Sequence, residues 1–524
     1  MTGALTLTTR VHATEDEELE PALQQRSRQS VDDAGGDNEA TREGLPFVYE
    51  LWLGGRYAME RRIPEAALVL DEDSGLWRDD ALLRPQPARR FPSFFVSGTL
   101  EIELVRGLSL ATLIDTGDLR SGASLEPPLD AILTSEGRTL GEAFTQGLML
   151  RELALVFHGG FGNAWLGRRR TAIAEGLVYD DFGNGAALNF EGDALVDGGY
   201  RVGLTALTVG RTFDELDDPS PLFSLELELL PSLFESLGVF AAYFKDNAGT
   251  LSEVFRSIGA ERIVLARLSN EPGIFQLNPV CLENALQPSE CRRQILLNQL
   301  FVNDTPNHGW MSYVGVEGKL LPAEGVSTRA TFAYALGEME VEGPTRTLHL
   351  EVGAWAGQLA ATIGLTETLG AGVFGFALSG DEPFDFLEDD RSSYASFMGV
   401  APLWTWTGLF FSGGLSQGFY AGRASSAGVN GRGVLGGGLV AEFAGERLTG
   451  EARLAWLEAF AASPPAPLGG GGTTYGIETD WRVELFIQKW LSVGGEVDLF
   501  WPGDFFPERD VAFRGLVQVL VHHG

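Results

Sequence analysis

The chain has 524 residues, 72 acidic and 38 basic side chains, and a formal charge of −34. Nucleic acids and anionic inner leaflets bind basic surfaces, so this charge argues against both as partners. No apolar run reaches the ~18 residues of a membrane-spanning helix, so any membrane crossing must be made by strands that close on themselves.

Residues 1–46 have the character of a tail. Leu5 to Val11 is weakly apolar and leads into Val11-His12-Ala13, which is similar to a small-residue cleavage site. Thr14 to Gly44 is polar, charged and free of aromatic residues. We expect the remnant of a secretion signal and then a disordered periplasmic tail.

Between Gly98 and Val521, apolar and polar residues alternate in many short runs, such as Gly98 to Leu104, Ser224 to Leu229, Leu348 to Val352 and Arg482 to Gln488. On a strand, this spacing places all apolar side chains on one face. Short turns and longer connections follow one another along the chain. The short turns are near Arg106-Gly107, Gly159-Gly160, Asp197-Gly198, Pro231-Ser232, Pro322-Ala323, Thr366-Glu367, Pro402-Leu403, Gly445-Glu446 and Lys489-Trp490. Among the longer connections are Thr171 to Gly183, Gly337 to Pro344, Asp381 to Arg391 and Ala421 to Gly431.

Short turns at one end and long loops at the other are typical of outer-membrane barrels. The sequence therefore predicts an all-β protein, a transmembrane antiparallel up-and-down β-barrel of 18–20 strands over residues 47–524. Phe47 to Arg61 is counted as the first strand and Ala186 to Glu191 as the sixth. The even count places both termini in the periplasm.

If the apolar faces meet lipid, charged residues point into the lumen. The predicted inward acids are Glu101, Glu103, Glu226, Glu228, Glu317, Glu351, Glu451, Glu484, Glu496 and Asp498, and the predicted inward bases are Lys319, Arg201, Arg329, Arg453, Arg482 and Arg514. Such groups can select solutes by charge, or they can pair across strands and hold the wall. Both interpretations stay open for each residue.

Three consecutive arginines, Arg168, Arg169 and Arg170, are the main candidates for solute contact. Successive strand residues alternate faces, so one or two of them would point into the lumen, where an arginine can bind a carboxylate through two hydrogen bonds. Alternatively, they anchor the rim in lipid headgroups. Arg151 and Arg201 are further candidates for the same basic patch.

Three segments in this region resemble the alginate-export family of outer-membrane porins: Met149 to Phe157, Asn163 to Arg170 and Gly176 to Asp181. Gly167, Arg168, Tyr179 and Asp180 match the Gly-Arg strand and Tyr-Asp loop of that family. The resemblance implies an eighteen-stranded barrel that passes an anionic polysaccharide through an arginine-lined constriction, with loops or turns as gates.

The longest connection, Asn247 to His308, has helical patterns and holds the two cysteines, Cys281 and Cys291. Exported proteins meet oxidising conditions, so we expect a disulfide between them. A connection of this length is usually functional or disordered. A lid over the pore, a passive external cap and a site for a partner protein are the alternatives.

The sequence predicts a passive channel in the outer membrane of a Gram-negative bacterium for a polar or anionic solute, with exopolysaccharide export as the resemblance implies. Expected partners are outer-membrane lipid, lipopolysaccharide, the solute and periplasmic export proteins; no cofactor or metal is expected. One alternative is a lipid hydrolase with His349 and Glu351 as base and acid, but no nucleophilic serine motif is present, so no enzyme is expected. A plugged structural or adhesive barrel is the other.

Overall fold

The computed structural model describes residues 47–61, 69–71, 76–78, 89–115, 119–120, 149–160, 162–192, 199–209, 220–230, 236–247, 249–265, 268, 270, 279–302, 308–323, 325–344, 346–383, 393–402, 407, 409, 424–464 and 469–523. The expected signal remnant and tail at residues 1–46 lie outside the described residues.

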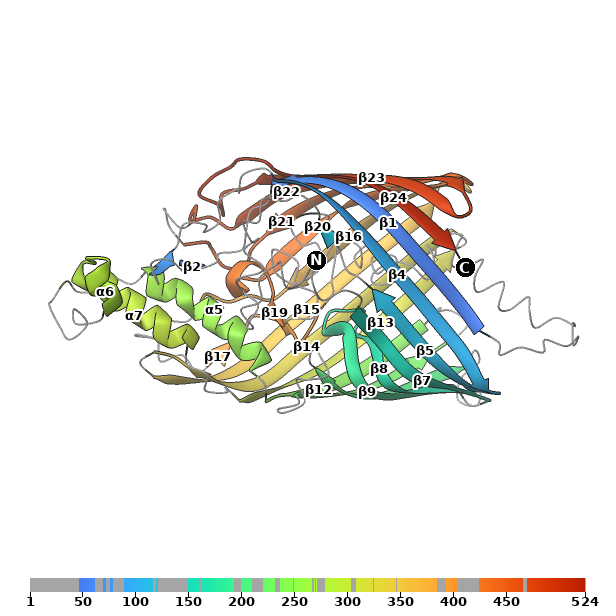
Figure 1. Cartoon of the computed structure of the whole chain (residues 1–524), viewed down its shortest axis with the longest axis horizontal. Coiled ribbons are helices and arrows are strands. Elements are labelled where there is room, and N and C mark those ends of the chain that lie inside the picture. The colour runs from blue at the N-terminus through green and yellow to red at the C-terminus, as the bar shows by residue number, and fades with distance from the viewer. Residues whose placement is uncertain are drawn as a thin grey trace, which may run out of the picture.

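Eighteen long antiparallel strands of the described chain form one closed barrel (Figure 1). They are β1 (Phe47–Arg61), β4 (Arg89–Val105), β5 (Leu108–Asp115), β7 (Met149–Gly159), β8 (Gly162–Ile173), β9 (Tyr179–Gly192), β10 (Tyr200–Val209), β11 (Ser220–Leu229), β12 (Ser236–Asp246), β13 (Gly309–Ala323), β14 (Val326–Glu342), β15 (Thr347–Gly364), β16 (Leu369–Leu378), β20 (Val434–Ala444), β21 (Leu448–Glu458), β22 (Thr474–Gln488), β23 (Leu491–Pro502) and β24 (Ala512–His523). Each strand pairs with the next, and β24 pairs with β1 to close the ring. The predicted barrel is confirmed.

Short stretches complete the sheet structure. The two-residue strands β6 (Leu119–Arg120) and β17 (Ser393–Tyr394) add to β4 and β15. Two small ribbons, β2 (Val69–Asp71) with β3 (Leu76–Arg78) and β18 (Met398–Gly399) with β19 (Ser425–Ser426), form separate two-stranded sheets that are not part of the wall.

The count of eighteen strands is the lower limit of the predicted 18–20. The additional strands of the higher estimate were predicted in one region of the chain. The sequence predicts wall strands on both sides of a turn at Pro402-Leu403, but β16 pairs directly with β20, through Leu378 and Val434. Residues 379–433 are therefore a single connection. Its apolar residues Phe397 and Met398 are buried inside the barrel rather than facing lipid, which explains why their pattern suggested strands.

The connections divide the barrel into two ends. Turns such as Arg106–Gly107 and Lys489–Trp490 lie at what we call the short-turn end, and the helices lie at the long-loop end (Figure 1). Two connections predicted to be long are short. Residues 174–178 alone join β8 to β9, and residues 343–346 join β14 to β15, because the polar residues that suggested loops continue the strands.

The outer face of the wall is apolar. Its exposed residues include Phe332, Leu359, Val373, Leu439, Leu454, Trp481, Val497 and Val517. In water, so continuous an apolar surface would be unfavourable, whereas an outer-membrane barrel needs such a band against lipid. Among the described helices, none has the length and apolar character to cross a membrane.

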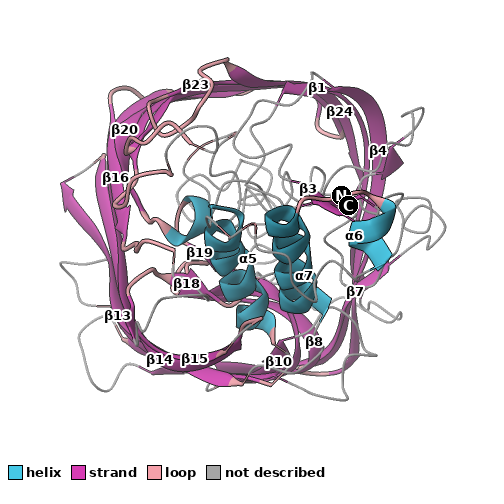
Figure 2. Cartoon of the chain, turned by 90° about the vertical axis from the view of Figure 1, so that its left-hand side faces the viewer, coloured by secondary structure: helices cyan, strands magenta, loops and turns pink. Residues whose placement is uncertain are grey.

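Helices from the β12–β13 connection lie at the long-loop end of the barrel (Figure 1). They are α5 (Thr250–Leu265), α6 (Pro279–Glu283) and α7 (Pro288–Val302), and Figure 2 shows α5 and α7 within the outline of the ring. The Asp246 carboxylate accepts hydrogen bonds from the Thr250 and Leu251 amides, both at 2.8 Å, and so caps α5. Cys281 and Cys291 form a disulfide, the pairing expected from the sequence, which joins α6 to α7.

These helices are part of an apolar core that occupies the lumen at the long-loop end. Phe255 and Ile258 of α5 and Leu297 of α7 pack with inward residues of the wall and with buried residues of the 379–433 connection. The wall residues include Phe244, Met311, Tyr313, Met339, Val341, Leu350 and Val352. We call this assembly the lumen core.

The lumen core reverses the expected polarity of the strands that it contacts. On β15, Leu350 and Val352 are buried against the core, while His349 and Glu351 are exposed on the outer face. The prediction that Glu351 points inward is therefore wrong. Here the inside is dry, so the apolar residues of the alternation face inward and the polar ones face outward.

Candidate functional site: a hairpin inside the lumen

One hairpin leaves the barrel wall. β7 pairs with β8 only up to Arg168, and β10 pairs with β9 only as far as Asn184. Within the wall sheet, residues 169–173 and 179–183 thus pair only with each other, while Tyr179 also forms an isolated bridge with Ala401. We call residues 169–183 the inner hairpin.

A glycine pair marks the point where the inner hairpin departs. Gly167 lies opposite Gly185. Gly167 has φ 137°, and a Cβ there would lie 2.3 Å from the Leu153 carbonyl oxygen, while a Cβ on Gly185 would lie 2.1 Å from the Ala206 oxygen. Only glycine fits such close approaches, which lets the hairpin bend away from its neighbours.

The tip of the inner hairpin meets the wall again at β14 and β15, which follow β10 to β13 around the ring. The Glu175 carboxylate accepts hydrogen bonds from Thr331 Oγ1 of β14 and Gln358 Nε2 of β15, both at 2.7 Å. Ala174 and Glu175 have φ 56° and 50°, a conformation that costs non-glycine residues about 1–2 kcal/mol each. The strained turn positions the carboxylate, so the hairpin is tethered at both ends.

The 379–433 connection holds the inner hairpin from the side of the lumen core. The Asp180 amide donates to the Ala401 carbonyl at 2.8 Å, and the Val400 amide donates to the Val178 carbonyl at 2.9 Å. Leu177 and Val178 are fully buried in the core. The inner hairpin is therefore held in place by hydrogen bonds and by burial, and it narrows the lumen in a fixed position.

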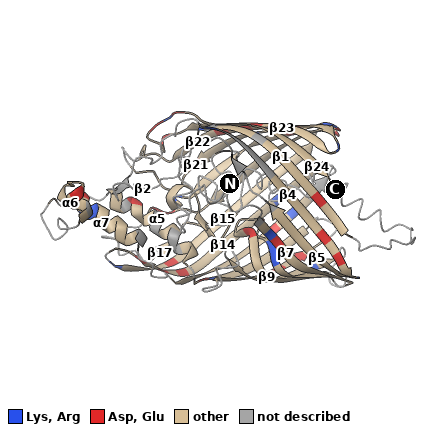
Figure 3. Ribbon diagram, in the orientation of Figure 1, with Lys and Arg blue, Asp and Glu red and all other residues tan. Residues whose placement is uncertain are grey.

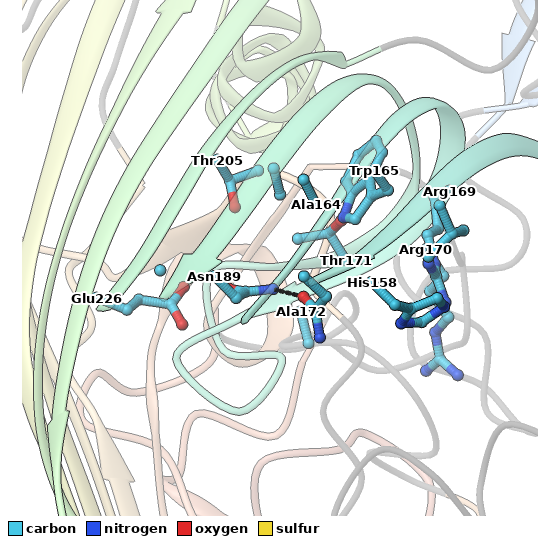
Figure 4. A pocket seen from close by; sticks show the side chains of 14 residues that line it. His158, Ala164, Trp165, Arg169, Arg170, Thr171, Ala172, Asn189, Thr205 and Glu226 are labelled. Carbon is cyan, nitrogen blue, oxygen red and sulfur yellow. Dashed lines mark hydrogen bonds between the residues drawn. The ribbon is translucent and has the colours of Figure 1, made fainter. Parts of the chain in front are cut away.

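Between the inner hairpin and the wall lies a cavity of about 320 Å³ (Figure 4). It is lined by Val156, His158, Asn163, Ala164, Trp165, Arg169, Arg170, Thr171, Ala172, Ala187, Asn189, Gly203, Thr205 and Glu226. The lining residues come from five strands, β7 to β11, and combine polar side chains with the aromatic side chain of Trp165. A cavity of this size and mixed lining suits a small polar solute.

The structure gathers six of the predicted pore residues at the inner hairpin. Arg170 donates to both Asp180 oxygens at 2.7 Å, and Arg169 lies 3.3 Å from Glu152. Arg168, Arg151 and Tyr179 are close by, and both arginines interact electrostatically with Asp181. Figure 3 shows basic and acidic residues side by side near β7.

The other predicted arginines lie elsewhere. Arg453, Arg482 and Arg514 line the inner wall of β21, β22 and β24, where they pair with Glu451, Glu496 and Asp498. Arg201 on β10 pairs with Glu191 and Glu228, and Arg329 lies opposite Lys319 on β13. Rather than one basic ring, the lumen has several paired groups.

Sequence reasoning missed the carboxylate that tethers the hairpin and the amide groups of the cavity. Glu175 lies in what was predicted to be a loop. Asn163 and Trp165 alternate on β8, and the Asn189 amide donates to the Asn163 oxygen at 2.9 Å. Asn163 was a visible signal, since an amide does not suit a lipid-facing position, and Trp165 two residues later shares its face.

Within the described chain, no group of three or more His, Cys, Asp or Glu side chains could hold a metal ion. His349 and Glu351, the residues of the hydrolase alternative, lie on the outer face of β15 and not beside the cavity. The arrangement around the cavity is suited to binding and passage of a solute.

No family model and no curated protein matches the sequence. Similar solved structures include the outer membrane protein OpdK of Pseudomonas aeruginosa, with 10% identity, coverage of 92% of this chain and 100% of that chain, and a TM-score of 0.45. Acinetobacter baumannii OccAB2 has 9% identity, coverage of 91% and 98%, and a TM-score of 0.46. Pseudomonas aeruginosa OccK11 has 10% identity, coverage of 90% and 95%, and a TM-score of 0.43. Values this low carry no argument about solutes, and membership of the alginate-export family is not shown.

Proposed function

We propose that the protein is a passive outer-membrane channel for small polar solutes. The observation that carries this proposal is the inner hairpin, which leaves the wall, extends inside the barrel to β14 and β15, and encloses a polar cavity against β7 to β11. A barrel of eighteen strands is wide enough to leave an aqueous lumen.

A small solute fits this constriction better than a polymer does. The cavity volume of about 320 Å³ is at the lower end of the range for small-molecule sites. An exopolysaccharide, the solute implied by the alginate-export resemblance, would require the inner hairpin to move, and the tethers of Glu175 and Ala401 oppose this movement.

Single-channel conductance in planar bilayers tests the proposal, together with swelling of proteoliposomes in monosaccharides, amino acids and oligosaccharides. We expect ohmic current and uptake of the small solutes only. If neither the intact protein nor a variant with residues 248–307 replaced by a short linker conducts, the channel function is wrong. Uptake of long oligosaccharides would instead favour polymer export.

A further inference from the structure

The arginines of the inner hairpin are already neutralised by carboxylates of the same chain. Arg170 makes two hydrogen bonds with Asp180, and Arg169 faces Glu152. The distances of 2.7 Å at Arg170 are typical of strong charge-assisted pairs. An incoming anion would have to compete with these partners, so the arginine run is a weak basis for anion binding.

The opposite side of the cavity has a different balance. Glu226 on β11 lines the cavity and contacts the Ser224 hydroxyl at 3.5 Å. Among the described residues, no basic side chain pairs with Glu226. Glu317 on β13 extends over Gly238, where a Cβ would lie 2.9 Å from its Cγ, and interacts electrostatically with Glu226. This side of the cavity is therefore characterised by carboxyl groups rather than by basic side chains.

Two acceptor atoms converge over Gly203, which has no side chain to fill the space between them. A Cβ at Gly203 would lie 3.2 Å from Asn189 Oδ1 and 3.9 Å from Glu226 Oε2. Asn189 uses its amide nitrogen to bond Asn163, so its oxygen is the atom that faces this space. Both atoms accept hydrogen bonds, and a ligand with several N–H donors would satisfy both.

We propose that this cavity selects solutes with a primary ammonium group, which donates to Glu226 and Asn189 above Gly203. Trp165 lines the same cavity, and an aromatic face favours a nearby cation or the alkyl part of an amine. This inference rests on the proposed channel function for its biological meaning. The binding site itself stands on the geometry of the cavity.

Butylammonium and butyrate are matched probes, because they are similar in size and opposite in charge. We would measure their binding to the purified protein in detergent micelles by calorimetry, and their block of potassium current in bilayers. Butylammonium should bind and block, and butyrate should not. Glu226→Gln should weaken butylammonium binding roughly tenfold, the usual loss when a charged hydrogen-bond acceptor is neutralised, and should lower the cation-to-anion permeability ratio.

Two further variants keep the test decisive. Asn189→Asp adds a carboxylate at the same place and should tighten butylammonium binding, whereas Glu338→Gln removes one charge from the outer face of β14 and should change nothing. Equal binding of the two probes, or unchanged binding by Glu226→Gln, would overturn the inference and leave the channel function intact. Glu226-dependent binding without any conductance would support the ammonium site and overturn the channel function.

Discussion

The long-loop end and the short-turn end of the lumen apply opposite rules to the same strands. On β14, Phe332 and Leu336 point outward to lipid, while the small side chain of Ala333 points inward. Near the end of the same strand, Met339 is buried inside the barrel and Glu338 is exposed on the outer face. The apolar stripe changes side along one strand. The alternation of apolar and polar residues therefore shows which face of a strand is away from water. That face contacts lipid in one region and the lumen core in the other.

This contrast separates two tasks. The lumen core at the long-loop end is packed and apolar, and it holds the inner hairpin in position. The lumen beyond the hairpin, toward the short-turn end, is lined by polar and charged residues such as Glu226, Asn163 and Arg201. In the proposed channel, the second region contacts the solute and the first provides rigidity.

The largest effect should come from breaking the buried pair that joins α5 to the 379–433 connection. Arg432 donates to both Glu261 oxygens, at 2.8 and 2.6 Å, and the two side chains are 3% and 6% exposed. Arg432→Ala would leave a buried carboxylate without this partner and should cost about 3–5 kcal/mol. We expect a lower urea midpoint and a noisier, larger conductance, measured by denaturant titration and bilayer recording.

The control for Arg432→Ala is a pair of the same chemistry at the surface. Arg61 donates to Asp510 at 2.6 Å, but the side chains are 30% and 62% exposed. Arg61→Ala should therefore change stability by at most about 1 kcal/mol. Equal losses in both variants would mean that the buried pair does not hold the lumen core.

The reversed polarity of β15 predicts that alanine substitutions at two adjacent residues, Leu350 and Glu351, will differ clearly in their effect on stability. Leu350→Ala removes a buried side chain of the lumen core and should destabilise the barrel by about 2–5 kcal/mol. Glu351→Ala alters an exposed outer residue and should stay within about 0.5 kcal/mol. Unfolding in urea would measure both, and a larger loss for Glu351→Ala would contradict the assigned faces.

A weaker effect is expected when the tip of the inner hairpin is released. Glu175→Ala removes two hydrogen bonds to a charged acceptor and should cost roughly 1–3 kcal/mol. Because the inner hairpin would lose its far tether, bilayer current should fluctuate between more levels. Glu175→Gln retains an acceptor oxygen and should behave more like the intact protein. If the current of Glu175→Ala is as steady as that of the intact protein, the Glu175 hydrogen bonds do not hold the inner hairpin in place.

The sequence was sufficient for the barrel because alternation and the asymmetry of the connections repeat along the whole chain. It was insufficient wherever a segment packs inside. Phe397 and Met398 have the pattern of strand residues, yet they are buried in the lumen core, and Glu351 faces outward for the same reason.

The candidate site was only partly predictable. Arg170 and Asp180 are ten positions apart in one hairpin, so their pairing follows from local structure. Glu175 and Gln358 are 183 positions apart, and only the closed barrel brings them together. Long-range contacts of this kind leave no periodic signal in one sequence.

The smallest effect on the pore should come from removing the disulfide. This change tests whether the long connection, Asn247 to His308, acts as a lid. Cys281 and Cys291 join α6 to α7, while the tethers of the inner hairpin come from Thr331, Gln358 and the 379–433 connection. The double substitution Cys281→Ser and Cys291→Ser should loosen α6 against α7 by about 2–3 kcal/mol of local stability, from the entropy of a short loop. Hydrogen exchange should increase in α6 and α7, with single-channel conductance unchanged. A rise in conductance would instead show that these two helices restrict the passage, and the lid would then extend from the inner hairpin to the helices.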